Sequence, residues 1–257
     1  MKNPIRKSKK ITILLLPMII VLIAISCQPG TKTQEWVSLF NGENLDGWDI
    51  KITGSELNNN YNNTFIVEDG LLKVNYDEYE EFNGEFGHIY YNEPFSHYKL
   101  RVEYRFVGEQ APGGPGWAFR NNGIMFHSQP ASEIELDQDF PISVEAQMLG
   151  GDGTNDRPNG SVCTPGTTVE IDGERIYDHC TNSDSRTFHG DDWVMFELEV
   201  YGDSLVRHII EGDTVMTYRN LQLEADGSSL SKGYIALQAE SHPTHFRKIE
   251  ILVLDEK

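Results

Sequence analysis

Alternating polar side chains mark the stretch Ile142 to Leu149 (ISVEAQML) as a strand that could carry catalytic groups. Successive side chains of a strand point to opposite faces, so Ser143, Glu145 and Gln147 share one face and apolar residues share the other. A carboxylate between two polar side chains can serve as a general base or a metal ligand, and the amide can bind a ligand hydroxyl. The same alternation is typical of any half-solvated strand, so the pattern leaves both interpretations open.

Three further candidates lie in the run that precedes this strand. His127 ends the extended segment NGIMFH, where it could join Glu145 as a catalytic residue or as a ligand of a divalent metal. A packed core histidine is the alternative. Arg120 and Asn122 stand at the start of the same segment, where they could bind substrate oxygens or simply shape the turn.

The remaining polar candidates lie near the C-terminus. Gln238 and Glu240 share a strand face with Tyr234 and Ala236, which makes them candidates for substrate binding. His242 follows at the strand end, where acid–base and metal-binding residues are often found. We therefore treat Glu145, His127 and His242 as the candidate catalytic residues.

An acidic run, EIELDQD from Glu133 to Asp139, offers a competing catalytic arrangement. Its four carboxylates stand at every second position, which on a strand would place their Cα atoms about 6.6–7 Å apart. That separation is compatible with the carboxyl pair of a retaining glycosidase. The run lies between Pro130 and Pro141, however, which favours an acidic loop.

Strand-type periodicity continues through most of the chain. HYKLRVEYRFV and WVMFELEVYG alternate apolar and polar residues, and TFIVEDGLLKV predicts a hairpin about Asp69-Gly70. No stretch of helical length carries an apolar stripe at helical spacing. The sequence predicts one all-β domain, a sandwich or jelly roll, over residues 36–257.

The N-terminus has the pattern of a secretion signal. A basic segment with five Lys or Arg residues precedes an apolar run from Ile11 to Ile25, which is short for a transmembrane anchor. Ala24-Ile25-Ser26-Cys27 resembles a bacterial lipobox. We expect a lipoprotein signal peptide at 1–26, lipidation of Cys27 and a tether at 27–35.

The charge and the tether indicate where the protein works and what it does not bind. Removing residues 1–26 takes away five positive charges and no negative ones, so the net charge of −19 becomes −24. Such an acidic surface argues against nucleic acid, and against membrane contact other than through the lipid. Gln28 after the lipobox and the lack of an early acidic cluster favour a periplasm-facing location on the outer membrane.

Two cysteines remain once Cys27 is assigned to the lipobox. In an exported protein Cys163 and Cys180 are expected to form a disulfide. A metal site that includes His179 is the alternative, but no close-spaced pair of thiols is present.

Four segments together resemble a known family. They are LFNGENLDGW, RNNGIMFH, VEAQMLGG and GYIALQAESHPTHFRKIEIL, which span nearly all of Trp36 to Leu254 in this order. The chain is similar to the 3-keto-disaccharide hydrolase domain, found in lipoproteins of Bacteroidetes-type bacteria. This resemblance implies a concanavalin A-like β-sandwich with a concave face for sugar.

The resemblance also implies cleavage of glycosides already oxidised at C3. A ketone at C3 acidifies the proton on C2, so a base can remove it and the C1 substituent leaves by β-elimination; water then adds back. Such a reaction needs a base, a stabiliser for the enolate and a proton donor, and a divalent metal could stabilise the enolate. It also needs a partner oxidoreductase that makes the ketone.

Two other functions remain open from the residues alone. Concanavalin-like folds also serve as non-catalytic sugar-binding modules, in which aromatic side chains hold the sugar. Trp117, Trp193 and Tyr234 could supply such a surface. The acidic run would instead make the protein a glucanase-type glycosidase.

Overall fold

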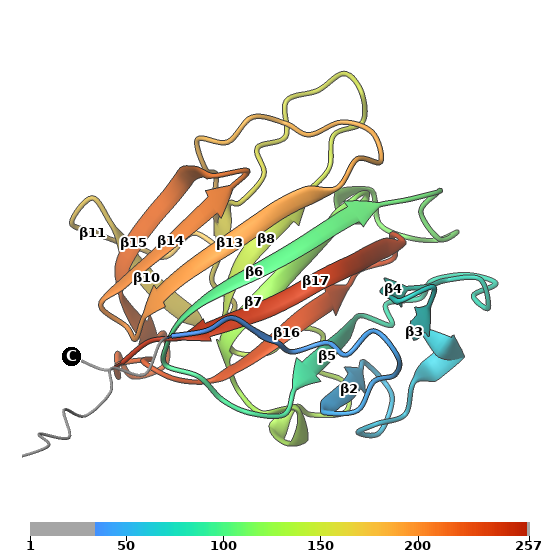
Figure 1. Cartoon of the computed structure of the whole chain (residues 1–257), viewed down its shortest axis with the longest axis horizontal. Helices are drawn as coiled ribbons and strands as arrows, with labels where there is room; N and C mark the ends of the chain where they lie inside the picture. The colour runs from blue at the N-terminus through green and yellow to red at the C-terminus, as the bar shows by residue number, and fades with distance from the viewer. Residues whose placement is uncertain (1–33, 256–257) are drawn as a thin grey trace, which may run out of the picture. The chain divides into compact units, whose positions relative to one another are not determined.

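The computed structural model describes residues 34–255, which form one compact unit of antiparallel strands (Figure 1). The expected signal peptide, the lipidated Cys27 and most of the tether lie outside the described residues. Within the described part, no helix is long and apolar enough to span a membrane.

Ten strands form the larger sheet. Its order is β11-β10-β15-β14-β13-β6-β17-β4-β3, and β1 pairs with β17. The strands are β1 (Val37–Ser38), β3 (Phe65–Glu68), β4 (Leu71–Val74), β6 (His97–Phe106), β10 (Thr167–Ile171), β11 (Glu174–Ile176), β13 (Val194–Tyr201), β14 (Leu205–Ile210), β15 (Asp213–Leu223) and β17 (Thr244–Val253). The hairpin predicted about Asp69-Gly70 is confirmed as β3–β4, and both turn residues have the positive φ that a two-residue hairpin loop requires.

Seven strands form the smaller sheet, in the order β12-β9-β8-β7-β16-β5-β2. They are β2 (Trp48–Ile52), β5 (Gly87–Tyr91), β7 (Asn121–Ser128), β8 (Val144–Leu149), β9 (Val162–Cys163), β12 (Cys180–Thr181) and β16 (Tyr234–Ala239). The helical elements of the described residues are three single 3-10 turns, η1 (Tyr61–Asn63), η2 (Gly116–Ala118) and η3 (Ala131–Glu133). The prediction of an all-β sandwich is confirmed.

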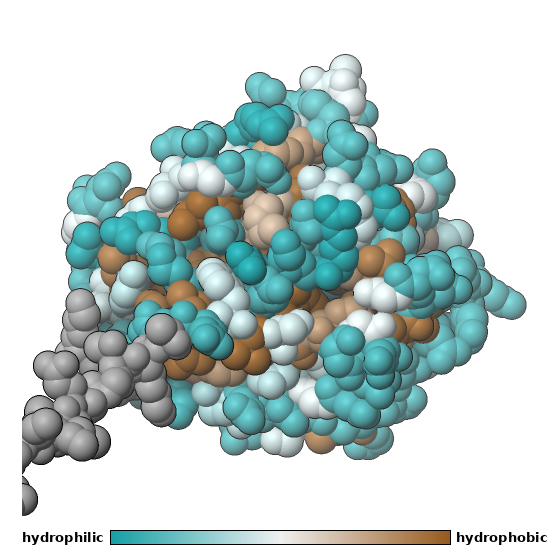
Figure 2. All heavy atoms as spheres, in the orientation of Figure 1, coloured by the Kyte–Doolittle hydropathy of each residue, from teal (hydrophilic) through white to brown (hydrophobic). Residues whose placement is uncertain are grey.

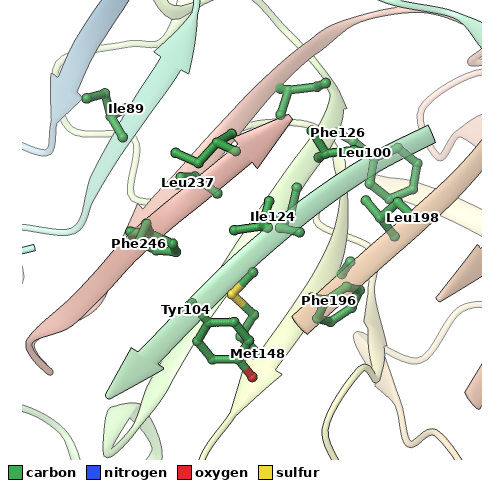
Figure 3. Packing of buried hydrophobic residues seen from close by; sticks show 14 of the residues in the cluster. Ile89, Leu100, Tyr104, Ile124, Phe126, Met148, Phe196, Leu198, Leu237 and Phe246 are labelled. Atoms are coloured by element: carbon green, nitrogen blue, oxygen red, sulfur yellow. The ribbon is translucent and has the colours of Figure 1, made fainter. Parts of the chain in front are cut away.

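The core lies between the two sheets. In Figure 1, β6, β13 and β17 lie in front of β7, β8 and β16. Side chains from both layers interdigitate, as Figure 3 shows for Leu100 and Tyr104 of β6 against Ile124 of β7 and Met148 of β8. Each of these four side chains is almost completely buried. This packing leaves the polar rows of β7, β8 and β16 on the outer face of the smaller sheet.

Candidate functional site

A pocket of about 370 Å³ lies on the outer face of the seven-stranded sheet. Its floor comes from β7 and β8, its edge from the β9–β12 pair, and its rim from the segments that connect the strands. We call this pocket the groove. It is lined by Trp117, Asn121, Phe140, Glu145, Gln147, Leu149, Arg157, Cys163, Pro165, His179, Cys180 and Glu240.

Glu145 reaches the groove because β8 alternates as predicted. Val144, Ala146 and Met148 are completely buried in the core, so Glu145 and Gln147 point the opposite way. The carboxyl of Glu145 then lies across the neighbouring strand, above Gly123. A Cβ atom at Gly123 would come within 2.3 Å of Glu145 Oε1, so only glycine leaves room for this side-chain position.

A second carboxyl, that of Glu240, lies beside Glu145. Both side chains are more than nine-tenths buried. Burial raises the pKa of Glu145 to about 8. Burial also raises the pKa of Glu240 well above its ordinary value; the charge of Glu145 adds to this and Arg157 opposes it. Two desolvated carboxyls that face each other resist double ionisation, so one can be a base while the other keeps its proton.

Polar atoms without partners gather on the same face. The amide oxygen and nitrogen of Gln238, Oδ1 of Asn121, Oε2 of Glu240 and Nε2 of His88 are buried and form no hydrogen bond with any residue between 34 and 255. Strand register places them together, because Gln238 is paired with His88 and follows Leu237, the partner of Ile124. Asn121 and Glu240 line the groove, whereas Gln238 and His88 lie on the same sheet face but outside its lining. Buried polar groups are normally satisfied, so unsatisfied ones in and beside a pocket indicate a ligand site.

His88 adds a neutral imidazole to this row. Burial lowers its pKa to about 3, so the ring carries no charge at neutral pH. It lies under the groove rim, 6.3 Å from the ring of Phe140 between centroids. A neutral ring with a free nitrogen can accept or donate one hydrogen bond to a ligand without adding charge.

Arg157 holds the groove wall in place. Its guanidinium donates to the carbonyl oxygens of Trp117 (2.8 Å), Phe119, Arg120 (3.2 Å) and Gly150 (3.0 Å). These bonds fasten the segment that carries Trp117 to the end of β8. The residue was not predicted from the sequence, because it stands in a polar loop where no periodicity distinguishes it from a solvated arginine.

The disulfide expected between Cys163 and Cys180 is present, with a Cα–Cα distance of 4.1 Å. Cys163 is the Cα partner of Glu145, and Cys180 is the partner of Cys163. Directly paired residues have their side chains on one face, so the two sulfurs form the wall of the groove beside Glu145. The alternative, a metal bound by these cysteines, is wrong because both sulfurs are used in the bond.

Residues 35–252 match the family model of the 3-keto-alpha-glucoside-1,2-lyase-like domain. The chain belongs to this family. The groove described above is therefore a pocket of a 3-keto-alpha-glucoside-1,2-lyase-like domain, in agreement with the resemblance seen in four sequence segments.

Solved structures with the same fold are distant in sequence. Two proposed glycosyl hydrolases from Parabacteroides distasonis ATCC 8503 have TM-scores of 0.51 and 0.52 at 16% and 18% identity; each comparison covers 86% of this chain, and 100% and 94% of the other. The carbohydrate recognition domain of Emp47p has a TM-score of 0.50 at 11% identity, covering 84% of this chain and 93% of its own. They agree with the expected concanavalin A-like jelly roll. No curated protein matches the chain.

His127 does not meet Glu145. Between Met125 and Ser128, β7 has one more residue than the opposing stretch of β16, and His127 takes a φ of +47° in this bulge. Its Nε2 lies 3.1 Å from the carbonyl oxygen of Gly202, in the turn between β13 and β14, and its ring packs beside Tyr98 of β6. The predicted metal pair of Glu145 and His127 is not assembled, because the two side chains point to opposite sides of their sheet.

His242 and Arg120 lie beyond the end of the groove. The imidazole of His242 packs edge-on against Phe106 and Phe119, and burial lowers its pKa to about 4. Arg120 turns outward and binds the carboxylate of Asp191 at 2.7 Å. Neither side chain lines the pocket that holds Glu145.

The strand period separates the two neighbouring asparagines. Asn122 faces the core, is completely buried, and donates to the carbonyl oxygen of Gln238 at 2.6 Å. It therefore joins β7 to β16, whereas Asn121 faces the groove. The predicted substrate contact at Asn122 is therefore not formed; the neighbouring Asn121 lines the pocket instead.

The competing acidic run forms no strand. Glu133 ends η3, and Glu135, Asp137 and Asp139 follow on an exposed loop. Without a shared strand face, these carboxylates do not form the regular row that the glycosidase hypothesis needs. The loop instead covers part of the sheet through Ile134, which packs with Tyr90 and Met125.

The three aromatic candidates lie in three different places. Trp117 lines the groove and is 53% exposed. Trp193 is flanked by the guanidinium groups of Arg105 and Arg247, at 4.6 and 4.3 Å from the ring centroid. Tyr234 lines a separate pocket with His127. A common aromatic surface is not formed.

No three His, Cys, Asp or Glu side chains come together as a metal-binding group anywhere in residues 34–255. The carboxyl pair in the groove supplies two acidic ligands and is surrounded by amides.

Proposed function

We propose that the groove binds a glycoside oxidised at C3 and cleaves it by β-elimination followed by addition of water. The observation that carries this proposal is the buried pair of Glu145 and Glu240, surrounded by polar groups that lack partners. Family membership supports the same substrate class. Together they supply a base, a proton donor and hydrogen-bond donors within one pocket.

Glu145 is the base in this mechanism. Its ionised carboxylate takes the proton from C2, which the neighbouring ketone acidifies, and the electron pair forms an enolate between C2 and C3. A pKa of about 8 suits this role, because a base is most effective when its pKa is near the working pH. Burial among apolar walls also keeps the carboxylate poorly hydrated and therefore reactive.

The enolate oxygen and the leaving group need donors. Side-chain amides of Asn121, Gln147 and Gln238 lie on the same face and can donate to the oxygen on C3. Burial raises the pKa of Glu240 and the two facing carboxyls resist double ionisation, so we assign the retained proton to Glu240, which can protonate the glycosidic oxygen as the C1–O bond breaks. Water then adds to C1 and a proton returns to C2, giving the free 3-keto sugar and the alcohol.

The test is product formation from a 3-keto-glucoside and from its unoxidised parent, each with and without a chelator. We expect turnover of the keto form alone. Glu145→Gln should reduce kcat by about 100- to 10,000-fold, the usual contribution of a general base. Its melting temperature should match that of wild type near pH 4.5, where Glu145 is mostly uncharged, and should exceed it at neutral pH, because only the carboxyl ionises on unfolding.

Other outcomes would replace the proposal. Turnover of the unoxidised parent would indicate a carboxylate-pair glycosidase. Saturable sugar binding with no turnover of either substrate would indicate a sugar-binding module. Loss of turnover with chelator, restored by a divalent cation, would show that a metal takes part in the reaction.

We also propose that the protein is lipidated at Cys27 and faces the periplasm from the outer membrane, where a sugar 3-oxidoreductase supplies its substrate. The motif Ala24-Ile25-Ser26-Cys27 and the acidic mature chain support this location. Cys27→Ala should release the protein from the membrane fraction. Retention of the variant in that fraction would contradict the lipid anchor.

A further inference from the structure

A second, smaller pocket adjoins the groove at Trp117. This pocket has a volume of about 200 Å³ and lies between η2 and the loop that follows β8. It shares two lining residues with the groove, Trp117 and Arg157. The other residues that line it are Gly116, Phe119, Asp152, Asn155 and Asp156. The two pockets therefore adjoin at a single aromatic side chain.

Trp117 is exposed but firmly supported. Its ring stacks on Phe86 with centroids 5.7 Å apart and an interplanar angle of 21°, and Phe86 packs on Phe140 at 5.1 Å. Its carbonyl oxygen accepts a hydrogen bond from Arg157 at 2.8 Å. The indole is nevertheless 53% exposed. An exposed indole held from below and through its backbone loses little freedom on binding, so it is suited to stacking against a ligand ring.

The second pocket is polar beyond the indole. The carboxylate of Asp152 is already used, since it accepts hydrogen bonds from the backbone of Thr154 and Asn155 and from the Asn155 amide. Asp156 is exposed on the same rim and takes no part in that turn. Its carboxylate can accept hydrogen bonds from ligand hydroxyls. An apolar surface beside such an acceptor matches a ring with one apolar face and polar edges.

We infer that Trp117 determines which leaving groups the groove accepts, by stacking on a ring attached at C1 that extends into the second pocket. The inference rests on the proposed function and adds to it the residue that selects the leaving group. Rings of either source, a sugar or an aromatic alcohol, share the apolar face that Trp117 recognises. Asp156 distinguishes the two, because only a sugar ring carries several hydroxyls.

The experiment compares Trp117→Ala with wild type on three 3-keto-glucosides, whose leaving groups are methanol, an aromatic alcohol and a second sugar. We expect kcat/KM to fall about tenfold for the two ring-bearing substrates, in the range of an aromatic contact. It should stay unchanged for the methyl compound. Trp117→Phe, which keeps a ring, should recover most of the loss. Asp156→Asn should affect the sugar leaving group alone.

The results separate this inference from the function it rests on. Equal losses on all three substrates would mean that Trp117 only supports the groove, and no loss on any would mean that the leaving group lies elsewhere; either result overturns the inference. If wild type cleaves none of the three, the proposed function fails first and the inference fails with it. An effect of Asp156→Asn on the aromatic substrate would contradict the assigned role of Asp156.

Discussion

The outer faces of the two sheets differ in whether their polar side chains are paired with one another. On the ten-stranded sheet, strand alternation exposes charged residues, and they pair across strands: Lys99 and Arg207 with Glu199, Arg101 with Glu250, and Arg247 with Glu103. Figure 2 shows this face, where hydrophilic side chains cover most of the surface with hydrophobic ones between them.

The groove face of the seven-stranded sheet holds fewer charges, and these are buried. Glu145 and Glu240 lie beside each other, and within residues 34–255 neither forms an ion pair and neither amide atom of Gln238 has a hydrogen-bond partner. The same period-two pattern in the sequence thus gives two different outer faces. On the larger sheet the polar side chains pair with one another, whereas on the smaller sheet several lack hydrogen-bond partners. The face that binds a ligand is identified by buried polar groups without hydrogen-bond partners, and not by its polarity alone.

Carboxyl groups on the two faces should make stability depend on pH in opposite directions. This is the largest effect that we expect. A raised carboxyl pKa contributes stability that is present below the unfolded value and is lost as pH rises. For Glu145 this loss spans pH 4.5 to about 8 and is on the order of 5 kcal/mol, at about 1.4 kcal/mol per pKa unit. Glu103, hydrogen-bonded to Arg247, has a lowered pKa, so its contribution is lost only as pH falls below 4.5.

Urea unfolding between pH 4.5 and 8.5 measures this difference. Wild type should lose stability across the range, Glu145→Gln should lose less, and Glu103→Gln should follow wild type. Glu240 keeps part of the slope in Glu145→Gln, because its pKa is also raised. Parallel curves for wild type and Glu145→Gln would show that Glu145 is not desolvated in the folded protein.

A methyl group at Gly123 should disturb the groove without disturbing the fold. Gly123→Ala forces the Glu145 side chain to move, and that side chain is flexible, so stability should change little. A displacement of about 1 Å at a reacting group can cost roughly 100-fold in rate, and we expect a loss of kcat of that order.

A double variant tests whether the glycine acts through Glu145. In a Glu145→Gln background, adding Gly123→Ala should cause no further loss, since the group that it displaces is already inactive. A full additional loss would place the effect of Gly123 elsewhere in the groove.

The smallest effect is expected on the charged face. Glu250→Gln removes a partly exposed ion pair with Arg101, and such pairs contribute about 1 kcal/mol or less. Turnover should be unchanged, and the stability difference should shrink at high salt because screening weakens the pair. A change in kcat would show that the charged face influences the groove, and would contradict the separation of the two faces.

Alternation alone was enough to predict the fold class and the faces of several site residues. It placed Glu145 and Gln147 together, as the pairing of β8 with β7 confirms. It also placed Gln238 with Glu240; Gln238 lies near the end of β16, and Glu240 lines the groove one residue past the strand. These predictions succeed because a strand has a fixed period of two and an apolar row that must be buried.

The failures share a physical cause. One extra residue in β7 reverses the direction of His127, and neither the residue types nor their spacing reveal a bulge. Asn121 and Asn122 differ only in register, which depends on the neighbouring strands. Gly123 and Arg157 matter through contacts with residues far away in sequence or on another strand, so their importance becomes visible only in three dimensions.

The complete groove requires oxidation of Cys163 and Cys180 to a disulfide. One wall beside Glu145 is a sulfur–sulfur bond between β9 and β12, so a chain that folds with free thiols has a different surface next to its base. Protein prepared in a reducing cytoplasm therefore lacks this part of the groove wall. Thiol titration should accompany every activity assay, so that an inactive sample is first checked for oxidation.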